Sequence, residues 1–172
     1  MGREVWIERS DFEESPQKGF FRLFPGNKVR LKYGHVVECT GCSRNADGAV
    51  AEVYARLIPD TKSGTPGSDA VKVKGVITWV AVADGLPAEV RLYDRLFTEP
   101  QPDAGGKDFL ASLNPNSLKI VRAVVEPSLA NAKADDRYQF ERHGYFVADR
   151  VDHAPGKPVF NLSVGLKDSW GK

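Results

Sequence analysis

The sequence predicts a mostly β chain that contains only a few short helices. Apolar and polar residues alternate over short runs, for example at 28–32, 52–57 and 71–74, which is the pattern of strands with one buried face. Turn-forming residues separate these runs at close spacing, as at 45–48 and 84–87. Short strands joined by such turns are typical of β-barrels and β-sandwiches, so we expect one of these two architectures.

The strand pattern stops near residue 100 and then resumes. Residues 99–106 (EPQPDAGG) are rich in Pro, Gly and Asp, so they predict a domain boundary rather than a strand. Beyond this break, strands are expected within residues 117–125, 138–149 and 157–166. Two short helices are also expected, at residues 10–17, where Ser10 is a candidate N-cap, and at residues 107–113.

Composition limits the function as well as the fold. With 172 residues and 41% hydrophobic content, the chain can bury a core as one large domain or two small ones. Its net charge of +1 provides no global basic surface, so any contact with nucleic acid must be local. The sequence has neither a run of about 18 apolar residues nor a signal peptide, so we expect a cytoplasmic protein without membrane contact.

A local basic segment lies between residues 15 and 37. The segment has no Asp or Glu, and its cationic residues are interleaved with aromatic ones. They are Lys18, Arg22, Lys28, Arg30, Lys32 and His35, with Phe20, Phe21, Phe24 and Tyr33. Cations for phosphates and flat rings for bases are what single-stranded nucleic acid requires. The alternative is that these cations solvate the outer face of a strand, where Arg30 and Lys32 would share a side, while the rings fill the core.

A second candidate for base recognition is the pair Gln139 and Arg142. An amide offers a donor and an acceptor together, and a guanidinium forks onto two acceptors, so the pair suits an unstacked base. A spacing of three does not place both side chains on one strand face, so a turn or bulge near His143 and Gly144 is needed. The alternative is an ordinary exposed strand.

Motifs for catalysis and metal binding are not found. Cys39 and Cys42 have the spacing of a zinc or redox pair, but the sequence has no second cysteine pair and its histidines are isolated, so both are expected to be thiols. The nucleophile-elbow, phosphate-loop, dinucleotide-binding and zinc-protease signatures are all missing. We therefore expect no active site, no metal and no cofactor on this chain.

Several segments together resemble the C-terminal anticodon-binding region of bacterial-type glutaminyl-tRNA synthetase, a class I aminoacyl-tRNA synthetase. The segments are residues 5–12 (VWIERSDF), 72–80 (KVKGVITWV), 91–97 (RLYDRLF), 109–115 (FLASLNP), 126–129 (EPSL), 139–142 (QFER) and 158–166 (PVFNLSVGL). The resemblance covers nearly the whole chain and includes the candidate pair Gln139 and Arg142.

The resemblance implies two antiparallel β-barrels of a ribosomal-protein-like kind, the distal one inserted into the proximal one. Residues 18–103 would form the distal barrel, and residues 1–17 with 104–172 the proximal barrel, which is expected to be incomplete at its N-terminal side. Family enzymes carry an N-terminal catalytic domain with HIGH-type and KMSKS-type signatures that this sequence lacks. The chain is therefore expected to be a monomeric fragment of a glutamine–tRNA ligase, whose ATP and Mg²⁺ belong to the missing catalytic domain.

The resemblance also implies roles for individual residues in binding the anticodon loop of a glutamine-accepting tRNA. Arg30 falls at an arginine that meets the first anticodon base, and Arg22 at one that meets the third. Gln139 and Arg142 match the residues that read the central base. Correct reading would then favour glutamine transfer at the remote catalytic site.

The sequence departs from the family pattern at three positions near the first and third bases. Lys32 stands where an arginine is usual, and Gly19 and Phe21 stand where polar or basic residues would help to hold the third base. Two alternatives to the glutamine enzyme remain open. One is the equivalent region of a eukaryotic-type glutamyl-tRNA synthetase, and the other is a stand-alone RNA-binding β-barrel protein.

Overall fold

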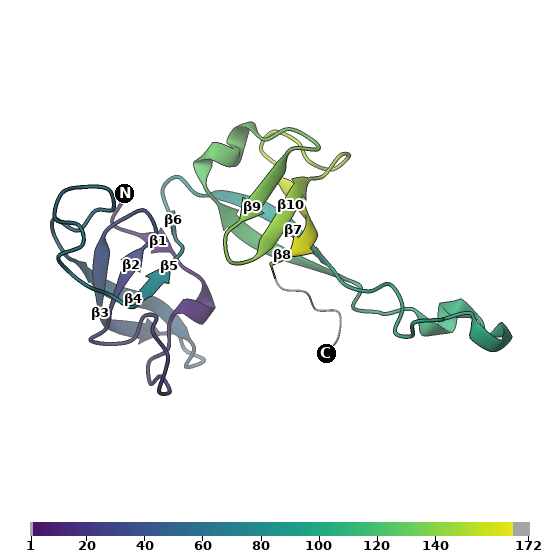
Figure 1. Cartoon of the computed structure of the whole chain (residues 1–172), viewed down its shortest axis with the longest axis horizontal. Helices are drawn as coiled ribbons and strands as arrows, with labels where there is room; N and C mark the ends of the chain where they lie inside the picture. The colour runs from purple at the N-terminus through teal and green to yellow at the C-terminus, as the bar shows by residue number, and fades with distance from the viewer. Residues whose placement is uncertain (1, 167–172) are drawn as a thin grey trace. The chain divides into compact units, whose positions relative to one another are not determined.

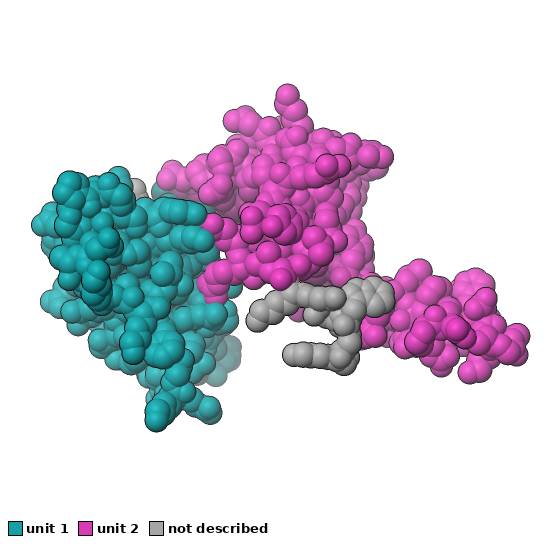
Figure 2. Space-filling view, viewed as in Figure 1, with its two compact units in different colours: residues 1–83 teal, residues 84–172 magenta. Residues whose placement is uncertain are grey.

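A computed structural model describes residues 2–166 and confirms the mostly β class (Figure 1). The chain forms two compact units, unit 1 (Met1–Ala83) and unit 2 (Asp84–Lys172) (Figure 2). Each unit has its own sheet and its own hydrophobic core. Within residues 2–166, no helix has the length and apolar character that crossing a membrane requires.

Unit 1 contains a four-stranded sheet and a separate strand pair. Its elements are β1 (Val5–Trp6), the 3-10 helix η1 (Arg9–Asp11), β2 (Lys28–Leu31), β3 (Val36–Arg44), β4 (Val50–Leu57), β5 (Gly75–Ile77) and β6 (Val80–Ala81). The sheet has the order β4-β3-β2-β5, in which β2 and β5 are parallel, and β1 pairs with β6. The alternation predicted at 28–32 is confirmed, because Val29 and Leu31 are buried while Lys28 is exposed.

Unit 2 contains a five-stranded sheet. Its elements are β7 (Leu86–Tyr93), η2 (Ala104–Gly106), η3 (Phe109–Ser112), β8 (Leu118–Val125), η4 (Pro127–Asn131), β9 (Arg137–Phe140), β10 (Gly144–Ala148) and β11 (Val159–Gly165). The order is β8-β7-β11-β10-β9, and β7 with β11 is its parallel pair. Rings fill the core, where Phe140 stacks on Phe146 at 4.4 Å and meets Phe160 edge-on at 5.3 Å between ring centroids.

An extended arm connects β7 to β8 in unit 2 (Figure 1). Its two sides are held together by a bridge between Phe97 and Leu113 and by a hydrogen bond from the Thr98 amide to the Ser112 carbonyl. The predicted break at 99–106 lies in this arm as turns and the short η2 helix, so those residues form no strand, as expected.

Charged residues tie the segment after β10 to the sheet of unit 2. Arg91 on β7 donates to Asp152 at 2.6 Å and to Asp149 at 3.3 Å. The Asp149 carboxylate also accepts the amides of Asp152 and Val151 and the side-chain amide of Asn161. These bonds, with the Asp152 amide as the largest cause, lower the pKa of Asp149 to about 2. The ionised carboxylate is therefore part of the folded structure.

Neither of the two predicted helices forms over its predicted range. The prediction of a helix at 10–17 was wrong, because only the 3-10 turn η1 forms and Phe12 already pairs with Leu23 in an isolated bridge. Burial of Phe12 in the core of unit 1 overrides local helix propensity there. At 107–113 the structure has only the 3-10 helix η3, which Asp108 caps by accepting the Leu110 amide at 3.0 Å.

Two strand predictions also need correction. Residues 71–74 form no strand, and β5 begins at Gly75, because this is where the chain pairs with Val29 of β2. Residues 138–149 form no single strand but fall in the hairpin of β9 and β10 with its turn at 141–143. The strands predicted at 52–57, 117–125 and 157–166 are confirmed as β4, β8 and β11.

The boundary between the two units lies between Ala83 and Asp84, whereas the resemblance implied boundaries at 17/18 and 103/104. The pairing order leaves β4 and β5 as the terminal strands of one sheet and β8 and β9 as those of the other. The division into a distal and a proximal barrel therefore stays a prediction.

Candidate nucleic-acid interface

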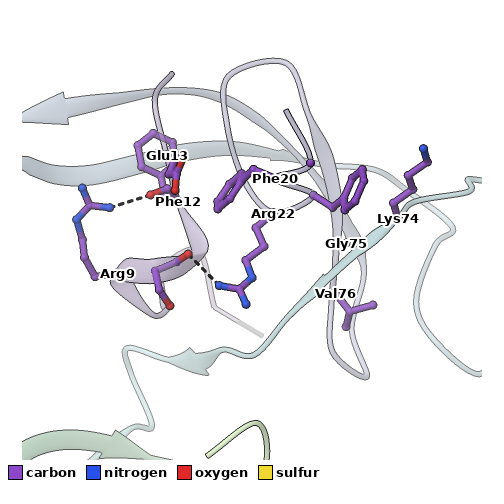
Figure 3. A pocket seen from close by; sticks show the side chains of 11 residues that line it. Arg9, Phe12, Glu13, Phe20, Arg22, Lys74, Gly75 and Val76 are labelled. Carbon is purple, nitrogen blue, oxygen red and sulfur yellow. Dashed lines mark hydrogen bonds between the residues drawn. The ribbon is translucent and has the colours of Figure 1, made fainter. Parts of the chain in front are cut away.

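A groove crosses one face of unit 1, between η1, the segment 19–22 and the start of β5 (Figure 3). Its lining includes the cationic residues Arg9, Arg22 and Lys74 and the rings of Phe20 and Phe21. The groove thus brings together a part of the basic segment and a lysine that lies far from it in the sequence. Cations beside exposed rings can hold a phosphate and stack a base.

Gly75 makes this groove possible because it has no side chain. A Cβ atom on Gly75 would approach the Phe21 carbonyl more closely than 3.0 Å, a separation that Cβ atoms essentially never show. The segment containing Phe21 therefore crosses directly over β5. The crossing leaves Phe21 51% exposed, with the Lys74 ammonium 5.2 Å from the centroid of its ring.

Arg22 is anchored on one side and exposed on the other. Its Nε atom lies 3.2 Å from a carboxylate oxygen of Asp11, which is fully buried. Its Nη1 atom donates to the Ser10 carbonyl at 3.1 Å (Figure 3). The Arg22 side chain nevertheless keeps 40% of its surface exposed. A guanidinium held in this way can present its remaining donors to an acceptor without losing much conformational freedom.

Arg30 on β2 has a different environment. Its Nη1 atom donates to the Thr61 carbonyl at 2.6 Å and its Nη2 atom to the Ser68 carbonyl at 2.7 Å. Its side chain is only 15% exposed. The alternative that Arg30 merely solvates an outer strand face does not describe this residue, because protein carbonyls replace water around its guanidinium.

Lys32 and Tyr33 follow directly after β2. Tyr33 has a left-handed backbone with φ of 58°, which is rare for a residue with a bulky side chain. This turn leaves Tyr33 73% exposed, and the Lys32 ammonium lies 5.4 Å from its ring centroid. The two side chains form a second cation and ring pair on unit 1.

In unit 2 the candidate pair Gln139 and Arg142 lies at the β9–β10 hairpin. Phe140 pairs with Gly144, so residues 141–143 form the turn, and the His143 amide donates to the Phe140 carbonyl at 3.0 Å. Arg142 takes a left-handed backbone with φ of 71° in this turn. The turn that the pair requires is therefore present, and both side chains are exposed.

An aromatic ring also lies beside the candidate pair Gln139 and Arg142. Tyr145 is the cross-strand neighbour of Gln139 and is 48% exposed. Facing residues of an antiparallel pair extend to the same side of the sheet, so the amide and the ring share one surface. That surface offers hydrogen bonds and a flat face side by side.

Cys39 and Cys42 lie on β3, separated by a bulge in its pairing with β4. Both are free thiols, and burial raises the pKa of Cys39 above its ordinary value. Within residues 2–166, no three side chains of the metal-binding types gather into a cluster.

Comparison with known families and proteins matches two regions of the chain, the first within unit 1 and the second running from the end of unit 1 into unit 2. The anticodon-binding domain of the class I tRNA synthetases (E and Q) is matched twice, by one family profile over residues 1–58 and by a second over residues 76–149. The chain belongs to this anticodon-binding family. Most residues that line the groove of unit 1 lie in the first matched region, whereas Lys74 and Gly75 lie between the two regions. The β9–β10 hairpin lies within the second region.

Curated relatives of this anticodon-binding family member carry the name glutamine–tRNA ligase. The identity is 71% with the protein of Ralstonia pickettii and 67% with that of Cupriavidus taiwanensis, each over 100% of this chain. It is 60% over 99% of the chain with the protein of Bordetella avium. The chain spans only about 30% of the length of these relatives.

The predicted contact residues of the anticodon-binding domains are divided between the two units. Arg22, Arg30 and Lys32 lie in unit 1, and Gln139 and Arg142 lie in unit 2. Lys74 and Tyr145 were not selected from the sequence. Alternation could indicate that each is exposed, but only tertiary and cross-strand pairing reveals that Lys74 lies over Phe21 and Tyr145 beside Gln139.

Proposed function

We propose that this chain binds the anticodon loop of a glutamine-accepting tRNA, as the anticodon-binding part of a glutamine–tRNA ligase. The observation that carries the proposal is the match of two anticodon-binding profiles to a chain whose relatives are named glutamine–tRNA ligase. These names favour the glutamine enzyme over the glutamate enzyme and over a stand-alone RNA-binding protein.

In the proposed mechanism the anticodon loop opens and its bases enter separate sites. Gln139 and Arg142 read the central base by hydrogen bonds, and Tyr145 provides a face on which a base can stack. Arg22 reads the third base from the groove of unit 1. Lysines such as Lys18 hold the RNA backbone electrostatically without distinguishing sequences.

Catalysis takes place outside this chain in the proposed protein. A catalytic domain in the same polypeptide supplies the ATP- and Mg²⁺-dependent aminoacylation. The chain described here contributes the choice of tRNA, because it binds the anticodon that identifies the tRNA. We expect a monomeric cytoplasmic enzyme.

Binding to a glutamine-tRNA anticodon stem-loop tests the proposal. The measurement compares the natural stem-loop with a copy whose central anticodon base is changed, at one fixed salt concentration. We expect the change to weaken binding about tenfold or more, since one good bidentate base contact contributes about 1–3 kcal/mol.

Two substitutions separate base recognition from backbone binding. Arg142→Ala should weaken binding to the natural stem-loop and reduce the preference for its central base. Lys18→Ala should weaken binding to both stem-loops equally and reduce the salt dependence by about one released counterion. Equal binding of both stem-loops by the unsubstituted chain would refute base reading and leave only a basic surface.

A further inference from the structure

Arg30 is the residue at which the structure differs most from the role that the resemblance assigns. A base-reading arginine needs two N–H groups pointing at the acceptors of the base. In this chain the terminal nitrogens Nη1 and Nη2 already donate to the carbonyls of Thr61 and Ser68, at 2.6 and 2.7 Å. Each terminal nitrogen carries a second N–H, but the side chain is only 15% exposed, so a base facing these nitrogens would compete with two charge-assisted hydrogen bonds inside the protein.

Both carbonyls belong to one segment, residues 59–70, which connects β4 towards β5. The segment is built from successive turns, in which the Ser68 amide donates to the Thr65 carbonyl and the Ala70 amide to the Gly67 carbonyl. Thr61 and Ser68 are its buried residues, and the Thr61 hydroxyl accepts the Val36 amide at 2.9 Å. Arg30 therefore joins two parts of a segment that has no strand of its own.

The same segment holds the turn that presents Tyr33. The Ser63 amide and the Ser63 hydroxyl both donate to the Gly34 carbonyl, at 3.0 and 3.1 Å. The Arg30 Nη1 atom lies 3.4 Å from that carbonyl as well. Continuous contacts thus run from Arg30 through residues 59–70 to the turn in which Tyr33 is 73% exposed.

We propose that Arg30 is a positioning residue, which fixes segment 59–70 and through it the Tyr33–Gly34 turn, and that the Tyr33 ring is the group that contacts RNA there. An exposed ring beside the Lys32 ammonium suits an unstacked base and its phosphate. The positioning role of Arg30 is argued from contacts within the protein and does not depend on RNA binding. The contact of Tyr33 with RNA rests on the function proposed above.

Hydrogen exchange in the RNA-free chain tests the positioning part. In Arg30→Lys, the amides of Ser63, Ser68 and Ala70 should exchange about tenfold faster or more, because two hydrogen bonds to a charged group are lost. Arg56→Lys is the matched control, since Arg56 on β4 is 69% exposed and contacts Glu38. Exchange in the control should equal that of the unsubstituted chain.

The proposed contact of the Tyr33 ring with RNA is tested by measuring stem-loop binding of Arg30→Lys, Tyr33→Ala and the double variant. If Arg30 acts by presenting the Tyr33 ring, the double variant should bind no more weakly than Tyr33→Ala alone. If Arg30 instead reads a base directly, the fold losses of affinity in the two single variants should multiply in the double variant, as they do for independent contacts.

The possible results lead to distinct conclusions. Unchanged exchange of the segment in Arg30→Lys would overturn the positioning role. Loss of the folded unit in both Arg30→Lys and Arg30→Gln would also overturn it, because the proposal limits the effect of Arg30 to the segment and the turn. Faster amide exchange of segment 59–70 in Arg30→Lys, together with affinity losses that multiply in the double variant, would keep the positioning role and refute the contact of Tyr33 with RNA. Absence of stem-loop binding in the unsubstituted chain would instead refute the proposed function.

Discussion

Substitution of Gly75 by alanine should destabilise unit 1 strongly. The added Cβ atom would overlap the Phe21 carbonyl and would also lie 3.1 Å from Cγ1 of buried Val29. The main obstacle is backbone, so no side-chain rotation relieves the overlap and the segment crossing β5 has to move. Overpacking of this kind costs about 3 kcal/mol, the upper part of its usual range.

Urea denaturation followed by tryptophan fluorescence measures this effect. Trp79 reports on unit 1, because it packs against the core and donates from Nε1 to the Lys32 carbonyl at 2.9 Å. A loss of about 3 kcal/mol in a unit of this size corresponds to a fall in Tm of more than about 10 °C. The slope of unfolding free energy against urea should stay the same.

Gly48→Ala is the control for this prediction. Gly48 has a φ of +77°, and no atom lies within 4 Å of the position that an added Cβ would take, so alanine there meets only backbone strain. That strain costs about 1 kcal/mol. Equal stability losses in Gly48→Ala and Gly75→Ala would refute the claim that the Phe21 segment crosses β5 too closely for any side chain at position 75.

Two further predictions concern titration and thiol reactivity. Because the pKa of Asp149 is lowered to about 2, its stabilising contribution is present above the ordinary pKa of 3.8 and is lost as the pH falls towards 2. In Asp149→Asn the free energy of unfolding should therefore fall less between about pH 4 and pH 2 than in the unsubstituted chain. The same pH dependence in both proteins would contradict this prediction. The raised pKa and burial of Cys39 predict that a thiol reagent modifies Cys42 first, while Cys39 reacts only on unfolding. Equal rates in the folded chain would refute this.

The sequence by itself determined the fold class, the strands β2, β4, β8 and β11, and where in the chain the candidate contact residues lie. Period-two alternation correctly indicated that Val29 and Leu31 are buried, because the side chains of a strand alternate whatever it pairs with. The spacing of Gln139 and Arg142 required a turn or bulge near His143 and Gly144, and the turn at 141–143 meets this requirement. The resemblance to the anticodon-binding region was carried by short segments spread along nearly the whole chain, and the family profiles agree with it.

Only the tertiary structure decided what surrounds each candidate residue. Arg30 was selected as a contact residue, yet its guanidinium meets carbonyls 31 and 38 residues away in the sequence. Lys74 meets Phe21, and the missing side chain of Gly75 allows the crossing that brings them together. Alternation tells which face a side chain occupies but not which distant segment covers that face. The partners depend on how the strands pair, and the parallel pairing of β2 with β5 is a property of the whole unit rather than of either strand.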